Sequence, residues 1–382
     1  MVMDLEIDGQ ESAESTYMKG VRHLCESGIT KVPRKYILPV SERPQLIMKK
    51  ERTSTCLNLK LPIIDLARLH TSDRSQVLES LAEACKVYGF FQVVNHNISC
   101  NAMRRMIDVG RRFFKLPFEE RVKHMSTDIR SPVRYGTSFN QTKDGVFCWR
   151  DFLKLYCHPL DTVIPFWPSS PSDLREEVTS YAMQAKSLFL ALMEAILETL
   201  GVNTSILREF DDDGSHLLVV NCYPACPEPH LTLGMPPHSD YGFLTLLLQD
   251  DVEGLQVQCE GEWVTVEPVP NSLVVNIGDH FEMVPSKSLL AQIFSNGMYK
   301  SVLHRVLVNS STSRMSVASL HSLPPDKMVS PSPELVNKKN PRLYKDTNFA
   351  AFLDYMSSCD TKHKNFLESR KLTQGKDEAK SQ

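Results

Sequence analysis

In the N-terminal part of the chain, segments with the hydrophobic pattern of a strand alternate with segments that have the pattern of a helix. Residues 61–66 and 90–95 are rich in β-branched and aromatic side chains, which predicts two strands. Apolar positions recur at helical spacing in residues 73–87 and 103–114, which predicts two helices. A long apolar face between residues 169 and 201 predicts a scaffold helix that ends at Gly201.

From residue 216 onward, the pattern changes to short apolar runs separated by Pro, Gly, Asn and Asp. The runs cover residues 216–223, 243–248, 254–258, 263–266, 272–277, 301–308 and 315–320. Many short strands with turn signals at close spacing are typical of a β-sandwich or barrel. One further helix is predicted near residues 349–356. We therefore predict a mainly β protein with flanking helices and an α/β N-terminal region.

These differences in the sequence pattern divide the chain into five parts. Residues up to about 57 are polar and show no sustained period, so we expect an irregular lead-in over 1–57. The remaining parts are an N-terminal region at 58–168, the scaffold helix region at 169–210, the β core at 211–336, and a C-terminal helix with a solvated tail at 337–382.

Composition narrows the classes of partner. The chain has 43 basic and 46 acidic residues and a formal net charge of -3, so nucleic acid is not an expected partner. No apolar run approaches the roughly 18 residues of a membrane span, and the acidic N-terminus lacks the order of a signal peptide. The 10 cysteines are too sparse for a secreted disulfide framework. We expect a soluble cytoplasmic monomer without a membrane partner.

Three side chains form a candidate metal site. His238 and Asp240 are two residues apart, so on an extended or turning backbone both can face one point. His304 lies far downstream in a strand-like run and supplies a third ligand. Two histidines and one carboxylate are the facial triad of non-haem iron(II) oxygenases, in which three metal positions stay open for a 2-oxo acid and dioxygen. The His-x-Asp pair by itself is a weak signal, because such tripeptides arise by chance.

A second group of residues strengthens this interpretation. Arg314 begins a strand-like run shortly after His304, and Ser316 lies two residues further on the same strand face. A guanidinium binds a carboxylate through two parallel hydrogen bonds, and the hydroxyl adds a third. The pair can therefore anchor the far end of a dicarboxylate, and Tyr223 is a candidate to contact the same co-substrate.

These residues resemble the plant 2-oxoglutarate and iron(II)-dependent dioxygenases, and the likeness covers about residues 60 to 356. It implies a double-stranded β-helix, or jelly roll, with His238, Asp240 and His304 as iron ligands. It also implies 2-oxoglutarate as co-substrate, bound by Tyr223, Arg314 and Ser316, with ascorbate as reductant. The motifs follow the family order: Asn221-Cys222-Tyr223-Pro224, His238-Ser239-Asp240, Gly254-Leu255-Gln256-Val257, Asn276-Ile277-Gly278-Asp279, His304-Arg305 and Arg314-Met315-Ser316.

Within the family, three stretches look most like the flavanone 3-hydroxylase and downy-mildew-resistance (salicylate hydroxylase) branch. This likeness implies hydroxylation of a small aromatic metabolite of flavonoid or phenolic acid type with O2, and release of succinate and CO2. A hormone or alkaloid substrate is the alternative. Leu320 replaces the phenylalanine usual in relatives, so it offers apolar contact without stacking. The three stretches are Ser138-Phe139-Asn140, Trp149-Arg150-Asp151 and Cys157-His158-Pro159.

Residues 283–292 are extra sequence by comparison with that family. The entropy of loop closure grows slowly with length, so a surface insertion need not unfold the core. We interpret it as an alternative splice product or a gene-model extension near the mouth of the site. An alternative of another class is that it abolishes turnover and leaves a metal- or ligand-binding protein.

Several other residues have ordinary structural explanations. His216, His230, His280 and His321 lack a partner at ligand spacing, so we expect polar or turn histidines. Phe90 and the neighbouring Phe91 are expected in the core. A serine hydrolase is disfavoured because no Gly-flanked nucleophile elbow is present.

Overall fold

The computed structural model describes residues 19–44, 60–138, 144–282, 295, 298–329, 342–358 and 366–372. Within these ranges, two β-sheets face each other and form the predicted jelly-roll core. The major sheet has the order β1-β2-β10-β7-β12-β5-β4-β3, and the minor sheet has the order β6-β11-β8-β9. The strands are β1 (Ile63–Asp65), β2 (Phe90–Val94), β3 (Val133–Thr137), β4 (Asp151–Tyr156), β5 (Ser215–Tyr223), β6 (Met235–His238), β7 (Leu244–Gln249), β8 (Leu255–Cys259), β9 (Glu262–Thr265), β10 (Leu273–Ile277), β11 (His304–Val306) and β12 (Arg314–Ser322).

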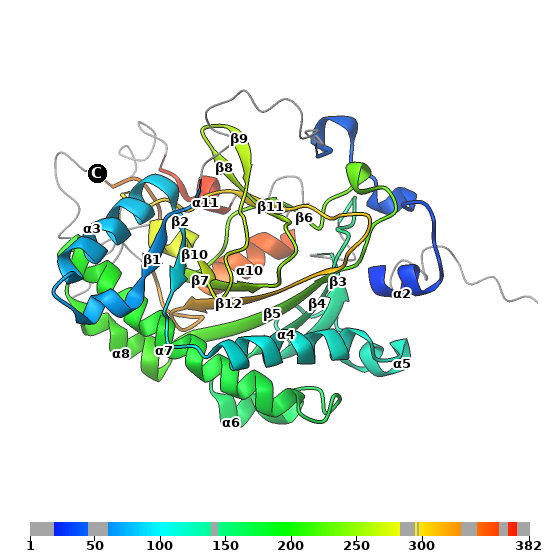
Figure 1. Ribbon diagram of the computed structural model, residues 1–382, viewed down its shortest axis with the longest axis horizontal. Helices are drawn as coiled ribbons and strands as arrows, with labels where there is room; N and C mark the ends of the chain where they lie inside the picture. The colour runs from blue at the N-terminus through cyan, green and yellow to red at the C-terminus, as the bar shows by residue number, and fades with distance from the viewer. Residues whose placement is uncertain are drawn as a thin grey trace, which may run out of the picture.

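Helices cover the face of the major sheet that points away from the minor sheet, with α4 and α7 directly beneath it (Figure 1). The α-helices are α2 (Val21–Glu26), α3 (Arg74–Glu83), α4 (Cys100–Phe114), α5 (Phe118–Arg121), α6 (Leu160–Val163), α7 (Leu174–Leu200), α8 (Leu207–Asp212), α9 (Asp279–Glu282), α10 (Phe349–Ser358) and α11 (Phe366–Arg370). Single 3-10 turns lie at Arg34–Tyr36, Val40–Glu42, Leu66–His70, Val122–His124, Ile164–Phe166, Thr204–Ile206 and Pro229–Leu231, and a π-helical turn covers Ala84–Tyr88.

The close packing of α4 on the sheet depends on Gly110. A Cβ atom at this position would stand 2.9 Å from Val220 Cγ1 and 3.3 Å from Met315 Cε. A larger residue would therefore require the side chains of Val220 and Met315 to move, so glycine favours the close approach of α4 to β5 and β12. Most of the apolar core lies in this layer between the helices and the sheet.

Most of the predicted elements are confirmed, including the long helix, which is α7 and ends at Gly201 in the left-handed conformation. Three strands were missing from the prediction. β3 and β4 carry charged side chains such as Arg134 and Lys154, which interrupt the apolar pattern. β6 contains Pro236 and Pro237, and proline disfavours a strand unless it lies at an edge, which is where β6 lies.

The five-part division of the chain stays a prediction, but residues 19–44 of the expected irregular lead-in contain one short helix and two 3-10 turns. This stretch forms α2 and packs Val21, Leu24 and Tyr36 against Trp149 in a small apolar cluster. The helix is only six residues long, too short for a periodic signal in the sequence.

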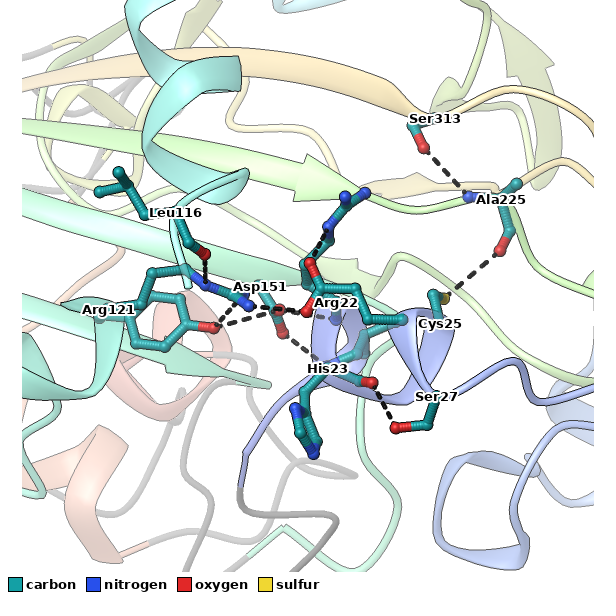
Figure 2. A network of polar contacts seen from close by, with 12 residues as sticks. Arg22, His23, Cys25, Ser27, Leu116, Arg121, Asp151, Ala225 and Ser313 are labelled. Atoms are coloured by element: carbon teal, nitrogen blue, oxygen red, sulfur yellow. Dashed lines mark hydrogen bonds and ion pairs between the residues drawn. The ribbon is translucent and has the colours of Figure 1, made fainter. Parts of the chain in front are cut away.

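Asp151 anchors α2 to the major sheet, as Figure 2 shows. Its Oδ1 and Oδ2 accept hydrogen bonds from the backbone N–H groups of Val21 and Arg22, each at 2.8 Å. Gly20 has φ 97°, and a Cβ atom there would stand 2.7 Å from Asp151 Oδ1. A glycine is therefore required where the chain enters the helix. The carboxylate caps N–H groups that would otherwise lack an intrahelical acceptor.

The extra segment at 283–292 lies outside the described residues. The residues on either side of the gap meet, because the Ser295 N–H donates to Phe281 O at 3.1 Å. Ser301 N–H also donates to Glu282 Oε2 at 2.6 Å. The chain therefore leaves and re-enters the fold at one place, and β10 and β11 on the two sides keep their pairing within the sheets.

Candidate active site

His238 and His304 are directly opposed across the minor sheet. β6 and β11 are antiparallel neighbours, and their register places His304 opposite His238, with the ring centroids 4.1 Å apart. Asp240 follows β6, and its Oδ1 lies 3.7 Å from His238 Nε2 and 3.6 Å from His304 Nε2. One ligand atom from each residue lies within 4.8 Å of the others. The three residues predicted from the sequence therefore come together in a geometry that can hold one metal ion.

Backbone carbonyl groups orient both imidazoles. His238 Nδ1 lies 2.8 Å from Pro236 O, and His304 Nδ1 lies 3.3 Å from Val302 O. A carbonyl oxygen only accepts hydrogen bonds, so Nδ1 carries the proton in each ring and Nε2 carries the lone pair. This tautomer directs both lone pairs toward Asp240, as a metal site requires.

The charge states of the site also suit a metal. Burial and the neighbouring His304 lower the pKa of His238 to about 3, so its imidazole is neutral at neutral pH. Burial alone would raise the pKa of Asp240, but His304 and His238 outweigh this effect and lower it. Asn276 Nδ2 also donates to Asp240 Oδ2 at 3.0 Å. A neutral imidazole and an ionised carboxylate are the forms that bind divalent metals.

Arg314 lies opposite Tyr223 in the pairing of β12 with β5, and its guanidinium stands 5.3 Å from the Tyr223 ring centroid. Its Nε donates to Val252 O at 3.1 Å and its Nη2 to Gln249 Oε1 at 2.8 Å. Gly254 makes room for the side chain, since a Cβ atom there would stand 2.8 Å from Arg314 Cδ. The guanidinium is therefore fixed by its surroundings before any ligand binds.

The remaining nitrogen of Arg314 points to a ligand. Arg314 Nη1 is buried and has no hydrogen-bond partner among the described residues. An unsatisfied buried donor costs about 1–3 kcal/mol, and burial also lowers the pKa of Arg314. A carboxylate would satisfy the nitrogen and neutralise the charge. Ser316, also buried, follows on the same strand face. These residues fit the far carboxylate of 2-oxoglutarate.

All six predicted residues line one cavity of about 290 Å³ between the two sheets. The triad lies on the minor-sheet side, and the cavity continues over the inner face of the major sheet to the C-terminal helices. Figure 1 shows α10 running between the sheets. The wall beyond the triad includes Phe152, Lys154, Tyr156, Leu320, Phe349 and Phe352.

Three residues of this cavity were missed from the sequence. Asn276 belongs to one of the family motifs, but only the fold shows that it holds Asp240. Phe90, expected in the core, also lines the cavity with its ring centroid 5.3 Å from that of His304. Lys154 was not recognised as a cavity residue because strand β4 was not predicted. The run Asp151–Tyr156, apolar after its first residue except for one long cationic side chain between Leu153 and Leu155, is the sequence feature that could have indicated both the strand and the residue.

Three of the four histidines that the sequence assigned to ordinary structural roles have partners within the fold. His216 Nε2 lies 2.8 Å from Ser319 Oγ, which also lies 2.9 Å from His321 Nε2. His280 Nδ1 lies 3.2 Å from Ser322 Oγ. These three rings are buried, whereas His230 is exposed. His321 does line the cavity wall.

Comparison with known proteins agrees with this site. The family model for the 2OG-Fe(II) oxygenase superfamily matches residues 214–322, and the model for the non-haem dioxygenase in morphine synthesis N-terminal region matches residues 61–170. Protein DMR6-LIKE OXYGENASE 2 of Arabidopsis thaliana is 40% identical over 331 residues, covering 86% of this chain and 90% of the relative. Flavanone 3-dioxygenase 2 of Oryza sativa subsp. japonica is 39% identical over 338 residues, covering 88% of this chain and 93% of the relative.

A solved structure shows the same fold. The crystal structure of JOX2 in complex with 2OG, Fe and JA superposes with a TM-score of 0.79 at 32% identity, covering 93% of this chain and 98% of that chain. This chain belongs to the 2OG-Fe(II) oxygenase superfamily. It is an oxidoreductase that uses iron(II), 2-oxoglutarate and O2 on a small molecule. The relatives thus favour an enzyme over a binding protein that has lost turnover.

Proposed function

We propose that His238, Asp240 and His304 hold the iron(II), and that Arg314, Ser316 and Tyr223 bind 2-oxoglutarate. One observation carries this proposal: the three metal-binding side chains and the buried Arg314 guanidinium line the same cavity. Arg314 Nη1 has no hydrogen-bond partner among the described residues. When bound, iron(II) and 2-oxoglutarate supply the oxidising chemistry, in which O2 yields a hydroxylated product, succinate and CO2.

The protein contributes position and a low-dielectric environment. The carbonyl acceptors of Pro236 and Val302 hold the imidazole planes, and Asn276 holds the carboxylate of Asp240. Fixing these groups before binding lowers the entropy cost of assembling the site. Apolar walls exclude water from the reacting centre, which strengthens the electrostatic interactions inside it.

The substrate that we propose is a small aromatic metabolite, a flavanone or a phenolic acid. Leu320 lines the cavity without an aromatic ring, but Phe152 and Tyr156 on β4 and Phe349 and Phe352 on α10 supply such rings. Aromatic side chains favour offset or edge contacts with an aromatic ligand. Relatives with the name flavanone 3-dioxygenase support this substrate class.

We also propose a cytoplasmic monomer with ascorbate as reductant and without nucleic acid or membrane partners. The near balance of charge, a net -3, supports the absence of a nucleic acid partner. Among the described helices, none has the length and apolar character needed to cross a bilayer. The large apolar side chains exposed in the described part of the chain belong to separate elements, such as Val40, Phe166 and Met183. Such scattered exposure does not indicate a binding surface.

Metal ligand variants test the core of the proposal. His238→Ala, Asp240→Ala and His304→Ala should each lose iron, measured by metal content after gel filtration, and should release no succinate from 2-oxoglutarate. His230→Ala is the matched control, because that ring is exposed and outside the cavity. A variant of the triad that keeps both iron and turnover would remove that residue from the metal site.

A substrate panel tests the reaction. The full-length protein with iron(II), 2-oxoglutarate and ascorbate should add one oxygen atom to a flavanone or a phenolic acid, detected as a mass shift. Hormone acids and alkaloids belong in the same panel. Oxidation of those compounds alone would replace the proposed substrate class, and no succinate release with any compound would contradict the proposed reaction.

A further inference from the structure

Two cations line the cavity side by side on β4 and β3, at one edge of the major sheet, whereas the metal triad belongs to the minor-sheet side. Lys154 on β4 is directly opposite Arg134 on β3 in an antiparallel pair, so both side chains lie on the same sheet face. Both residues line the cavity. Like charges directly opposite each other destabilise a sheet. Asp128 acts electrostatically on both cations, and a ligand of negative charge would add to this stabilisation.

Lys154 keeps hydrogen-bonding capacity toward the cavity. Its Nζ donates to Ile129 O at 2.6 Å and lies 4.8 Å from the Tyr156 ring centroid. An ammonium group has three donors, and Ile129 O is its single acceptor among the described residues. Burial, followed by the charge of Arg134, lowers the pKa of Lys154 to about 7. The ammonium form therefore lacks the stabilisation that a carboxylate would provide.

No protein carboxylate lines the cavity beside these two cations within the described part of the chain. The acidic lining residues are Asp240 and Asp279, and Asp279 N–H donates to Asp240 O at 2.8 Å, so both lie at the metal site. Asp128 acts on Lys154 electrostatically, but it is not part of the cavity wall. Within the described part of the chain, the Lys154 ammonium therefore has no carboxylate partner in the wall of the cavity that it lines.

The spacing between the cations and the 2-oxoglutarate strand suits one aromatic ring. Lys154 pairs with Val219 on β5, and Val219 pairs with Ala318 on β12. Neighbouring strands lie about 4.8 Å apart, so the β4 backbone is roughly 10 Å from the backbone of β12. Val219 and Ala318 also line the cavity, and they form an apolar floor between the two.

We propose that Lys154, assisted by Arg134, binds a carboxylate of the substrate, which makes the substrate a small aromatic acid and not a neutral flavanone. This inference rests on the proposed function, because it names the substrate class of the same cavity. Lys154 acts as a specificity-determining residue, since it lines the cavity from β4 of the major sheet and is not part of the metal triad.

Binding of matched acids and esters tests this inference. The probes are 2-hydroxybenzoate and 4-hydroxycinnamate, their methyl esters, and the neutral flavanone naringenin. Affinity is measured by titration calorimetry on the full chain loaded with zinc(II) and 2-oxoglutarate, which prevents turnover and keeps Arg314 occupied. At least one acid should bind on the order of ten- to hundredfold tighter than its ester, the range of a charge-assisted hydrogen bond.

Variants assign the effect to one side chain. Lys154→Met, which has a similar volume and no charge, should bring the acid and ester to similar affinity, while Lys154→Arg should keep the preference for the acid. Lys123→Met is the matched control, because Lys123 is exposed on the surface beside Glu120. Thermal unfolding of each variant verifies that the fold is retained.

The outcomes separate this inference from the proposed function. Wild-type protein that binds no acid more tightly than its ester overturns the inference without any variant. Lys154→Met that retains the preference overturns it as well. Hydroxylation of naringenin but of neither acid overturns the inference and leaves the proposed function intact. Failure to release succinate with iron(II) under any condition overturns the proposed function itself.

Discussion

Backbone carbonyl groups and one amide hold the side chains of the candidate metal site. His238 and His304 each donate Nδ1–H to a carbonyl two residues earlier, and Asn276 donates to Asp240. The two histidines therefore obtain the same orientation from the same local geometry. Asn276 belongs to β10 of the major sheet, whereas Asp240 follows β6 of the minor sheet. The hydrogen bond between them therefore links the two layers of the core.

Asn276→Ala should weaken binding of iron(II) or manganese(II) about 10- to 100-fold, the usual effect of removing a partner that orients a metal ligand. Asp240 would keep its charge but lose its fixed orientation. Metal titration with a fluorescent competitor measures this effect. Asn203→Ala, at an exposed turn where the side chain accepts from Ser205 N–H, is the control. Unchanged metal affinity would show that the Asn276 contact is not needed.

Arg314→Lys should raise the concentration of 2-oxoglutarate needed for half-maximal succinate release by about 10-fold or more, because an ammonium cannot form the two parallel bonds of a guanidinium. Metal affinity should stay the same, which a titration verifies. Arg305→Lys is a matched control, since Arg305 donates to Gln256 and lies outside the cavity wall. An unchanged 2-oxoglutarate requirement would contradict the anchor role.

At the scale of elements, β4 connects the N-terminal helix to the cavity. Phe152 and Lys154 point into the cavity, whereas Asp151, on the opposite face, caps α2. Asp151 is fully buried, and desolvation is the main cause that raises its pKa. The two backbone N–H bonds, together with Arg121, oppose this effect. One carboxylate therefore contributes to the stability of α2, together with the apolar cluster around Trp149.

Asp151→Ala should lower the free energy of unfolding by about 1–3 kcal/mol, since two backbone donors lose their acceptor. Urea denaturation measures the loss, and hydrogen exchange should be faster in α2. Asp108→Ala is the control, because its ion pair with Arg112 one helical turn away is at the surface and contributes about 0–1 kcal/mol. Equal stability of the two variants would contradict the anchoring role of Asp151.

At the scale of the whole molecule, buried histidines join the sheet to the helices. The His321 ring stacks on Phe189 of α7 at 4.3 Å and on His216 at 4.2 Å. Burial lowers the pKa of His216 from 6.5 to about 3 and that of His321 well below 6.5. The folded protein thus keeps these rings neutral at a pH at which the unfolded chain protonates them.

This difference makes stability fall as the pH decreases below 6.5 toward 3, because the unfolded state binds more protons. For one histidine the slope is at most about 1.4 kcal/mol per pH unit. Wild-type protein should therefore lose stability relative to His216→Gln between pH 6.5 and pH 5, as measured by urea denaturation. Burial raises the pKa of Asp279 to about 7, which by itself makes stability rise as the pH decreases. This effect is common to wild type and His216→Gln, so it cancels in the comparison.

His230→Gln is the control for this measurement, because an exposed ring should show no such pH-dependent difference from wild type. A constant difference between wild type and His216→Gln from pH 7 to pH 5 would show that His216 is not kept neutral by the fold.

The sequence alone determined much of the fold and most of the candidate site. Periodicity located α4, α7 and most strands of the core, because burial of one face repeats at the period of the local backbone. The pairs His238 with Asp240 and Arg314 with Ser316 were predictable, because residues two apart share a side of an extended chain. A strand-like run suggested His304 as the third ligand, and the family motifs added the jelly roll.

Only the tertiary structure decided which distant segments meet. The register that sets His304 opposite His238, and Lys154 opposite Arg134, depends on strand pairing across many intervening residues. The docking of α2 on Asp151 and the aromatic wall from α10 depend likewise on packing of the whole chain. Local patterns record which side of an element is buried, but they hold no information about the partner that buries it.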